Sequence, residues 1–409
     1  MSTAAATRPE IVRMTALERR AAIGLASISG LRMLGMFIVL PVFAFFAETL
    51  PGGRDRTLVG LALGAYGLTQ AVLQVPFGWA SDKWGRRPVI YSGLLLFAAG
   101  SFLAAWAPTI GWTIVGRAVQ GAGAVSAVVI ALCADSTRES VRTRAMAVIG
   151  ITIAATFALS LVAGPLLNAA IGVPGIFALT GVLALFAIAV VRFGVPEVAA
   201  SPSPAPSRGA FRRVIADANL LRLNYGIFAL HALLMALFVE MPFALRDNGV
   251  AADDQWEVYL PVIVLSVAMM WPFARAADQP QRGKPVFVGA VGVLLIAQAA
   301  LAFGINSLPA LLAGLLLFFA AFNLLEATLP SLVSRYAPSD LKGSALGVYA
   351  SVQFLGAFAG AAIGGWLAQH AGAAAVFGFG VALTAVWLVI SLTMAAPPAY
   401  PSTYSMGET

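Results

Sequence analysis

GWASDKWGRRP (residues 78–88) is a short charged stretch between two apolar runs that are each long enough to cross a bilayer. Gly78 and Gly85 indicate close backbone approach and a tight reversal, because glycine adopts conformations that other residues avoid. An ordinary positive loop would explain the cations but not the glycine spacing or the acid, Asp82. We therefore interpret the stretch as a charge cluster that pins helix ends together at the membrane surface.

The composition is that of a polytopic membrane protein. The chain has 409 residues, of which 60% are hydrophobic and only 11% charged, whereas soluble domains carry roughly 25% charged residues. The net charge of +7 does not indicate a nucleic-acid partner, because the cations fall in short loops rather than on one face. The single cysteine, Cys133, excludes an internal disulfide, and no metal-ligand spacing is present. We expect no metal and no cofactor.

Twelve apolar runs reach the roughly 20 residues that a membrane-spanning helix needs. The sequence therefore predicts an all-α integral membrane protein with twelve transmembrane helices. The predicted helices cover residues 21–47, 57–80, 88–107, 110–133, 144–170, 173–195, 220–247, 256–277, 285–304, 307–333, 343–369 and 372–395.

Segment 196–219 differs in composition from the rest of the chain. Prolines alternate there with Ala and Ser, and three arginines follow, which is typical of a flexible linker with a basic patch at the membrane surface. It divides the protein into two pseudo-symmetric halves of six helices, 21–195 and 220–395, the architecture of a two-fold transporter. We expect residues 1–20 and 396–409 to be cytoplasmic end segments.

The cations predict the orientation in the lipid bilayer. With both termini in the cytoplasm, the loops on the cytoplasmic side hold 20 of the 25 Lys and Arg residues. The opposite loops hold three, Arg54, Arg56 and Arg246. Because cytoplasmic loops are enriched in Lys and Arg, we expect both termini to be cytoplasmic.

Inserting an ionisable side chain at the centre of a membrane helix costs at least about 2.5–3.5 kcal/mol of free energy. Such residues are therefore retained for a structural or functional purpose. Five are placed at membrane depth, away from the ends of the predicted helices or at a depth that needs explaining: Arg32, Arg117, His231, Glu240 and Glu326. Arg117 shares a helix face with Gln120, and small residues follow it, so that a neighbouring helix can pack closely. An arginine that faces a cavity can hold an anion or polarise a proton carrier, and one that faces a helix can tie helices through backbone carbonyls.

Two acids are candidates for carrying protons. Glu326 is in the middle of a helix, with Asn323 on the same face, and is either a proton carrier or a neutral acid that bonds a neighbouring helix. Glu240 is near the outer end of the seventh helix and either lines a cavity or lies at the interface. His231 lies on a different face from Glu240, and a lone histidine in a helix is more often packed than a proton relay.

Polar aromatic and amide side chains add to a possible pocket, although each alone is compatible with plain helix packing. These residues are Tyr66, Gln70, Gln74, Asn224, Tyr225, Tyr349 and Gln353. The helices around them are rich in Phe, Met and Leu. Such a cavity suits a bulky apolar or amphipathic compound better than a sugar, which needs many hydrogen-bond partners.

These features resemble the major facilitator superfamily of transporters over all twelve predicted helices. Its motif A, G-x-L-x-D-[RK]-x-G-[RK]-[RK], is matched except that Ala80 replaces the usual Leu. Arg117, Gln120 and Gly121 resemble its motif B in the fourth helix. The residues that match motif A are Gly78, Asp82, Lys83, Gly85, Arg86 and Arg87.

The fifth helix resembles the antiporter motif, motif C, in part. Gly164 and Pro165 are in place. Ser160, Asn168 and Ala169 stand where small glycines are common in that motif. The resemblance implies antiport, although these departures weaken the implication.

The closest resemblance is to the YajR-type drug–proton antiporters of bacteria. It is carried by residues 29–37, 66–72, 220–231, 322–327 and 347–356. Members of that group can carry a soluble C-terminal domain. This chain ends in a short polar tail, so the resemblance implies a version without that domain.

The resemblance also implies a mechanism. In such proteins motif A latches the two halves together in the outward-open state. Asp82 would then cap the start of the eleventh helix near Gly343 and Ser344, and Arg86 would pair with Asp135. Proton binding at a cavity acid would bias the two states and drive substrate out.

We expect a proton-coupled antiporter in the bacterial inner membrane that exports small amphipathic or hydrophobic compounds as a monomer, driven by the proton gradient. The expected latch residues are Gly78, Asp82, Lys83, Gly85, Arg86, Arg87 and Asp135. The expected proton-coupling residues are Glu326, Glu240 and Arg117. The expected substrate-facing residues are Arg32, Tyr66, Gln70, Gln120, His231, Asn323, Tyr349 and Gln353, and Gly164 with Pro165 forms the antiporter motif.

Three other readings remain. A sugar or metabolite exporter or uniporter is the rival within transport. A non-transporting membrane sensor is disfavoured by the intact motif A, because a latch is useful only to a protein that switches. An enzyme is disfavoured because the sequence has no nucleophile–base pair, metal-ligand spacing or phosphate-binding glycine loop.

Overall fold

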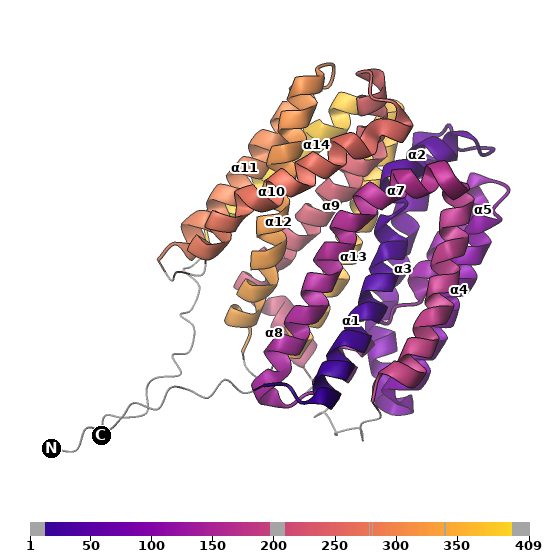
Figure 1. Ribbon diagram of the computed structural model, residues 1–409. Helices are drawn as coiled ribbons and strands as arrows, with labels where there is room; N and C mark the ends of the chain where they lie inside the picture. Colours follow the sequence, from indigo (N-terminus) through magenta and orange to yellow (C-terminus); the bar gives the residue numbers. More distant parts are fainter. Residues whose placement is uncertain (1–12, 197–208, 278, 280, 339–340, 395–409) are drawn as a thin grey trace.

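The computed structural model describes residues 13–196, 209–277, 279, 281–338 and 341–394. Over these residues the chain forms one bundle of helices (Figure 1). The first half contains α1 (Ala16–Phe37), α2 (Leu40–Glu48), α3 (Arg56–Trp84), α4 (Arg86–Ala105), α5 (Ile110–Ala122), α6 (Ser126–Asp135), α7 (Glu139–Ala189) and the π-helix η1 (Val190–Gly194). The second half contains α8 (Ala210–Ala216), α9 (Ala218–Asp247), the 3-10 turn η2 (Ala252–Asp254), α10 (Gln255–Ala277), α11 (Gly283–Phe303), α12 (Leu308–Tyr336), α13 (Lys342–His370) and α14 (Ala373–Leu392).

The expected twelve membrane spans are confirmed. The described residues contain eleven helical segments long and apolar enough to cross a membrane. One of them, α7, has 51 residues and would be about 77 Å long if straight, more than twice the ~30 Å hydrocarbon core. Gly172 breaks it with a φ of +67°, a left-handed conformation that glycine adopts without strain. α7 therefore supplies the fifth and sixth spans.

Two spans that were expected to be continuous are broken. The first, predicted over 21–47, is interrupted between α1 and α2, because Pro41 has no N–H to donate to the carbonyl of Phe37. The fourth, predicted over 110–133, is interrupted between α5 and α6, where Ala124 N–H donates to the Ala122 carbonyl at 2.8 Å in a tight turn. Ala16–Glu48 and Ile110–Asp135 still each form one membrane span, as predicted, and the interruptions were not predictable because hydropathy does not change at either one.

The segments expected to lie outside the membrane are described only in part. In the expected linker 196–219, residues 197–208 lie outside the described part of the chain, and the rest contains α8 and the start of α9. In the expected segment 1–20, Thr15 caps α1. The expected tail 396–409 lies outside the described residues.

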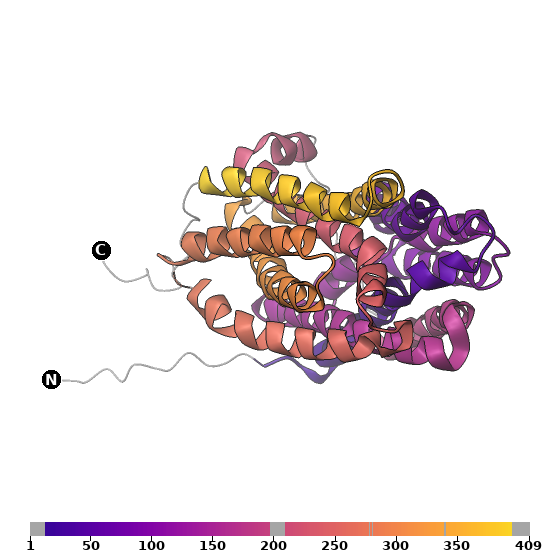
Figure 2. The same ribbon diagram turned by 90° about the horizontal axis from the view of Figure 1, so that it is seen from above.

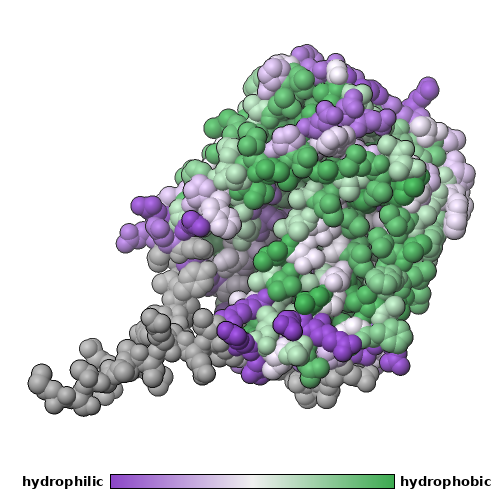
Figure 3. Space-filling model, viewed as in Figure 1, coloured by the Kyte–Doolittle hydropathy of each residue, from purple (hydrophilic) through white to green (hydrophobic). Residues whose placement is uncertain are grey.

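The two halves lie side by side when seen along the bundle (Figure 2). Each has two ends. We call the end with Asp82 and Arg138 the inner end, because the cations predict that it faces the cytoplasm, and the end with Arg56 and Asp247 the outer end. Large apolar side chains are exposed along the flanks between these ends, including Leu159, as expected of a surface in contact with lipid (Figure 3).

The two halves are packed together at the outer end and apart at the inner end. α3 and α13 cross where a Cβ on Gly60 would lie 2.2 Å from the carbonyl oxygen of Ala361, and one on Gly67 would lie 2.8 Å from that of Phe354. Nearer the inner end, a Cβ on Gly78 would meet no atom within 4 Å. In Figure 3 the surface is hollowed between the halves, below the diagonal of α10. The protein is therefore closed at its outer end and open at its inner end.

Candidate functional site

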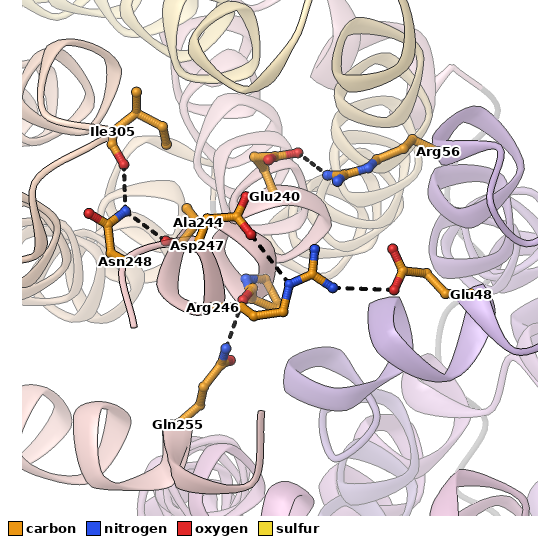
Figure 4. Close-up of polar contacts among 10 residues, drawn as sticks. Glu48, Arg56, Glu240, Ala244, Arg246, Asp247, Asn248, Gln255 and Ile305 are labelled. Carbon is orange, nitrogen blue, oxygen red and sulfur yellow. Dashed lines mark hydrogen bonds and ion pairs between the residues drawn. The ribbon is translucent and has the colours of Figure 1, made fainter. Parts of the chain in front are cut away.

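An ion pair between the halves closes the outer end. Arg56, at the start of α3, places Nη1 2.6 Å from Oε2 of Glu240 on α9 (Figure 4). Only 6% of the Glu240 side chain is exposed. The Arg56 guanidinium also lies 3.8 Å from the ring centroid of Phe243, and its backbone N–H donates to Gln369 of α13 at 2.9 Å. A carboxylate and a guanidinium with so little solvent around them hold the two halves together.

A second pair repeats this arrangement with the charges exchanged. Glu48 of α2 accepts a hydrogen bond from Arg246 of α9 at 3.3 Å (Figure 4). The Phe45 and Phe243 rings pack edge to face between the pairs, with centroids 5.3 Å apart. Each half thus supplies one acid, one arginine and one phenylalanine to the closed end. This pair is exposed and contributes less than the pair of Arg56.

The sequence reasoning missed this cluster. It placed Glu240 in a cavity or at the interface, and it counted Arg56 and Arg246 only as outer-loop cations. The structure places Glu240 in the closed outer end. The available signal was that each half has an acid and an arginine close together at the outer ends of its helices. That signal does not specify the partners, because Arg56 and Glu240 are 184 residues apart.

An aromatic layer between the halves blocks the middle of the bundle. The Phe157 ring of α7 lies 6.2 Å from the Phe319 ring and 5.9 Å from the Phe322 ring of α12, between centroids. Phe37 of α1 packs on Phe157 edge to face at 4.9 Å. Since α12 runs from the outer to the inner end, residues after Phe322 lie on the inner side of this layer.

Glu326 lies one turn of α12 beyond Phe322 and is the centre of a polar cluster of the second half. Its Oε1 accepts a hydrogen bond from Nε2 of Gln353 on α13 at 3.3 Å. Gln353 Nε2 is also 2.7 Å from Nε2 of His231 on α9, and this histidine nitrogen is 3.9 Å from Oε2 of Glu326. Tyr349 lies one turn before Gln353 on α13 and is buried. Three helices thus bring together Glu326, Gln353 and His231, which the sequence named separately.

Glu326 is both deep and accessible. It is in the middle of the bundle along α12, yet 38% of its side chain is exposed. Its Oε2 is nevertheless buried and has no hydrogen-bond partner among the described residues, so the exposed surface belongs to the rest of the side chain. His231, by contrast, is 4% exposed and packs against the Phe322 ring at 5.9 Å. Glu326 therefore borders the space that opens toward the inner end.

A second polar cluster lies in the first half around Tyr66 of α3. Arg32 of α1 donates to Ser126 Oγ and lies 3.5 Å from Tyr66 Oη. The Arg117 guanidinium of α5 lies 5.1 Å from the Tyr66 ring centroid and donates to Gln120 Oε1 at 2.6 Å. All five of these residues except Ser126 are buried.

The other residues expected to face substrate make contacts within one half. Gln70 donates to Gln74 one turn further along α3, and both are buried. Asn323 donates to Ser266 Oγ at 3.0 Å and thereby joins α12 to α10. Gln120 donates to Ser101 of α4 at 2.8 Å. These contacts tie neighbouring helices within a half.

Motif A makes one of its two expected contacts. Arg86 Nε lies 3.1 Å from Asp135 Oδ2, as the resemblance implied. The expected cap of α13 by Asp82 is not made: among the described residues Asp82 pairs only with Arg86, and 52% of its side chain is exposed. A Cβ on Gly343 would meet nothing within 4 Å. The physical reason is the separation of the halves at the inner end, which also leaves Gly78 without the expected close contact.

The remaining motif A residues shape the turn and anchor it within the first half. Gly85 has a φ of +92° and makes the predicted tight reversal between α3 and α4. Arg87 donates to the Val195 carbonyl at 2.7 Å, just after η1. Lys83 is exposed and lies 5.4 Å from the Trp79 ring centroid.

Two further contacts stiffen this inner end of the first half. Arg138 pairs with Glu18 of α1 at 2.8 Å, and Arg20 donates to the Gly194 carbonyl at 2.9 Å.

At the antiporter motif, a Cβ on Gly164 would lie 2.5 Å from the Ile38 carbonyl oxygen. This glycine, directly before Pro165, therefore lets α7 pack on the break between α1 and α2.

Comparisons with known proteins cover nearly the whole chain. The Major Facilitator Superfamily profile matches residues 25–361 and 264–407. The chain is 44% identical over 389 residues to the inner membrane transport protein YajR of Escherichia coli, covering 94% of this chain and 86% of that protein. It is 27% identical over 357 residues to the multidrug resistance protein MdtH of Aeromonas hydrophila, covering 85% and 87%.

A solved structure shows the same fold. A bacterial homologue of the human lysosomal transporter Spinster, in an inward-facing and occupied conformation, superposes with a TM-score of 0.75 at 13% identity. The superposition covers 93% of this chain and 97% of that one. The relatives are membrane transporters rather than enzymes.

Proposed function

The chain belongs to the Major Facilitator Superfamily, and from this membership we propose that it is a proton-coupled antiporter that exports small amphipathic or hydrophobic compounds. It works by alternating access between the two six-helix halves. It acts as a monomer in the bacterial inner membrane, with both termini in the cytoplasm and the proton gradient as its energy source. The inner-membrane location of YajR and the multidrug resistance named for MdtH support this proposal.

The surroundings of Glu326 carry the proposal. Its side chain is partly exposed on the inner side of the aromatic layer, and its partners are an amide and an imidazole rather than a guanidinium. A carboxyl with neutral partners at this depth changes its charge more readily than one held in an ion pair, such as Glu240 with Arg56. Glu326 is therefore the proton carrier, and Arg117 across the bundle couples it to substrate.

Glu240 has a different role in this cycle. Its ion pair with Arg56 spans the two halves, so it stabilises only the state that is closed at the outer end. Protonation of Glu240 from outside would remove half of that pair and favour opening. Glu240 is thus the acid of the outer gate.

Motif A stabilises the opposite state. When the inner ends close, Asp82 reaches the start of α13, where a carboxylate at a helix N-terminus is worth about 0.3–1 kcal/mol. Arg86 and Asp135 stay paired in both states, since both belong to the first half. Exposed Asp82 in the present state is compatible with a latch that is released.

The aromatic layer supports an amphipathic substrate. Phe157, Phe319 and Phe322 meet between the halves, one helical turn from Glu326. Apolar and aromatic linings favour compounds with a large apolar surface, with a few polar groups to orient them.

The test uses proteoliposomes with a pH-sensitive dye inside and an imposed proton gradient. Glu326→Gln abolishes the proton flux that substrate elicits but retains exchange of labelled substrate for unlabelled substrate, because exchange needs no net proton movement. Glu257→Gln, at an exposed acid of α10, is the matched control and keeps both activities. Substrate-dependent proton flux through Glu326→Gln would make Glu326 structural and Glu240 the proton carrier.

A further inference from the structure

Two arginines are buried in the middle of the first half. Arg32 is 4% exposed and Arg117 is 1% exposed. They come from α1 and α5 and lie on either side of Tyr66, which Arg32 approaches at the hydroxyl and Arg117 at the ring face. Tyr66 in turn packs edge to face on Phe354 of α13, at 6.4 Å between centroids. Both charged groups therefore contact the same side chain, Tyr66, which lies at the interface of the halves.

No carboxylate of the described residues pairs with these charges. None of the ion pairs among the described residues includes Arg32 or Arg117, and their hydrogen-bond partners are the neutral side chains of Ser126, Tyr66 and Gln120. The acids in the described part of this half all lie at helix ends: Glu18, Glu48, Asp55, Asp82, Asp135 and Glu139. Buried charges in proteins are as a rule paired, so two unpaired guanidiniums indicate a counter-charge from outside the chain.

Arg117 has its carboxylate-binding edge free. Nη1 donates to Gln120, whereas Nε and Nη2 are buried with no partner among the described residues. Nε and Nη2 lie on one edge of the guanidinium, and their N–H bonds run parallel at the spacing of the two oxygens of a carboxylate. Gln120 is itself held by Ser101, so the free edge is fixed in direction.

From these contacts we propose that Arg117, assisted by Arg32, binds the anionic group of the transported compound. This inference rests on the proposed function and narrows its substrates to amphipathic organic anions such as aromatic carboxylates. The carboxylate accepts two hydrogen bonds from Nε and Nη2 of Arg117, and the Tyr66 side chain turns away to admit it. The apolar body of the compound packs against the aromatic layer next to Phe354.

The test compares two probes with the same ring and opposite charge, tritiated 1-naphthoate and 1-naphthylmethylammonium. Equilibrium binding to the full chain in nanodiscs is measured first. The wild type binds naphthoate at least tenfold more tightly than the ammonium compound. Arg117→Gln weakens naphthoate binding at least tenfold and leaves binding of the ammonium compound unchanged or stronger.

Two further variants separate charge from geometry and from misfolding. Arg117→Lys keeps the charge but lacks the parallel N–H edge, so its naphthoate affinity lies between those of the wild type and Arg117→Gln. Arg54→Gln removes an exposed outer arginine and leaves both affinities unchanged. Arg32→Gln, which weakens naphthoate binding, replaces Arg117→Gln if that variant does not fold.

The outcomes distinguish this inference from the antiport proposal. Naphthoate affinity that is the same in wild type and both arginine variants overturns the inference, as does a wild type that binds neither probe or prefers the ammonium compound. Proton flux elicited by the ammonium compound and not by naphthoate leaves antiport standing and removes the inference. Naphthoate binding through Arg117 without any proton flux leaves the inference standing and removes antiport.

Discussion

The outer and inner ends of this bundle use ion pairs in different ways. At the outer end, Arg56 with Glu240 and Glu48 with Arg246 join one half to the other. At the inner end, Arg86 with Asp135 joins elements of the first half. In the proposed alternating-access cycle, a pair that crosses between the halves is broken each time the outer end opens, whereas a pair within one half is kept and holds that half rigid. Arginine–carboxylate ion pairs therefore join the two halves at the outer end and stabilise a single half at the inner end.

The largest effect is expected from Arg56→Glu, which places two acids together at the outer end. Breaking a partly buried ion pair costs about 3–5 kcal/mol, so the equilibrium shifts toward outer opening by about two to four orders of magnitude. Spin labels on cysteines at Arg54 and Asp253, in a Cys133→Ala background, measure the outer separation. The double variant Arg56→Glu with Glu240→Arg restores the short distance, and an unchanged distance in the single variant would remove the gate role.

A smaller shift is expected from Gly60→Ala. Its Cβ would lie 2.2 Å from the carbonyl oxygen of Ala361 in the opposite half, and overpacking of this kind costs about 1–3 kcal/mol. The same spin labels should report a longer outer distance and a larger open population. Gly289→Ala on α11 is the matched control, because its Cβ meets no atom within 4 Å. Equal distances in the two variants would contradict the close crossing of α3 and α13.

The smallest shift is expected from Asp82→Asn, which weakens the inner latch only in the other state. In the Arg56→Glu background, where the outer end is mostly open, it should return the population toward outer closure by about two- to fivefold, corresponding to 0.3–1 kcal/mol at a helix N-terminus. Transport slows as a result. If the spin-label distances in the double variant match those of Arg56→Glu alone, Asp82 does not act on the equilibrium.

Much of the fold could be predicted from hydropathy alone, since each span must bury its backbone in lipid and therefore be apolar over its length. The breaks at Ile38–Val39 and Gly123–Val125 could not, because the broken segments are as apolar as the intact ones. The reversal at Gly85 was predictable from its glycine and the charges beside it.

The candidate site was predictable as single residues and not as clusters. Glu326 and His231 stand out because ionisable groups are rare at membrane depth. Their meeting through Gln353 depends on the packing of α9, α12 and α13, which the local sequence does not encode. The contact of Asp82 with the start of α13 is absent for another reason. In the proposed cycle this contact forms only when the inner end is closed, and the sequence is the same in both conformational states.

In the proposed transport cycle and orientation, Arg32 and Arg117, which have no ion pair among the described residues, also make the transporter sensitive to voltage. A charge that crosses the whole membrane field exchanges about 2.3 kcal/mol per 100 mV, and a fixed charge does so in part when the aqueous space beside it switches sides. With the inner end in the cytoplasm, an inside-negative potential lowers the energy of Arg32 and Arg117 when the bundle opens inward. On this proposal the membrane potential stabilises the inward-open state of the empty carrier, and the proposed anion, by neutralising one of the arginines, reduces that stabilisation and favours the outward-open state of the loaded carrier.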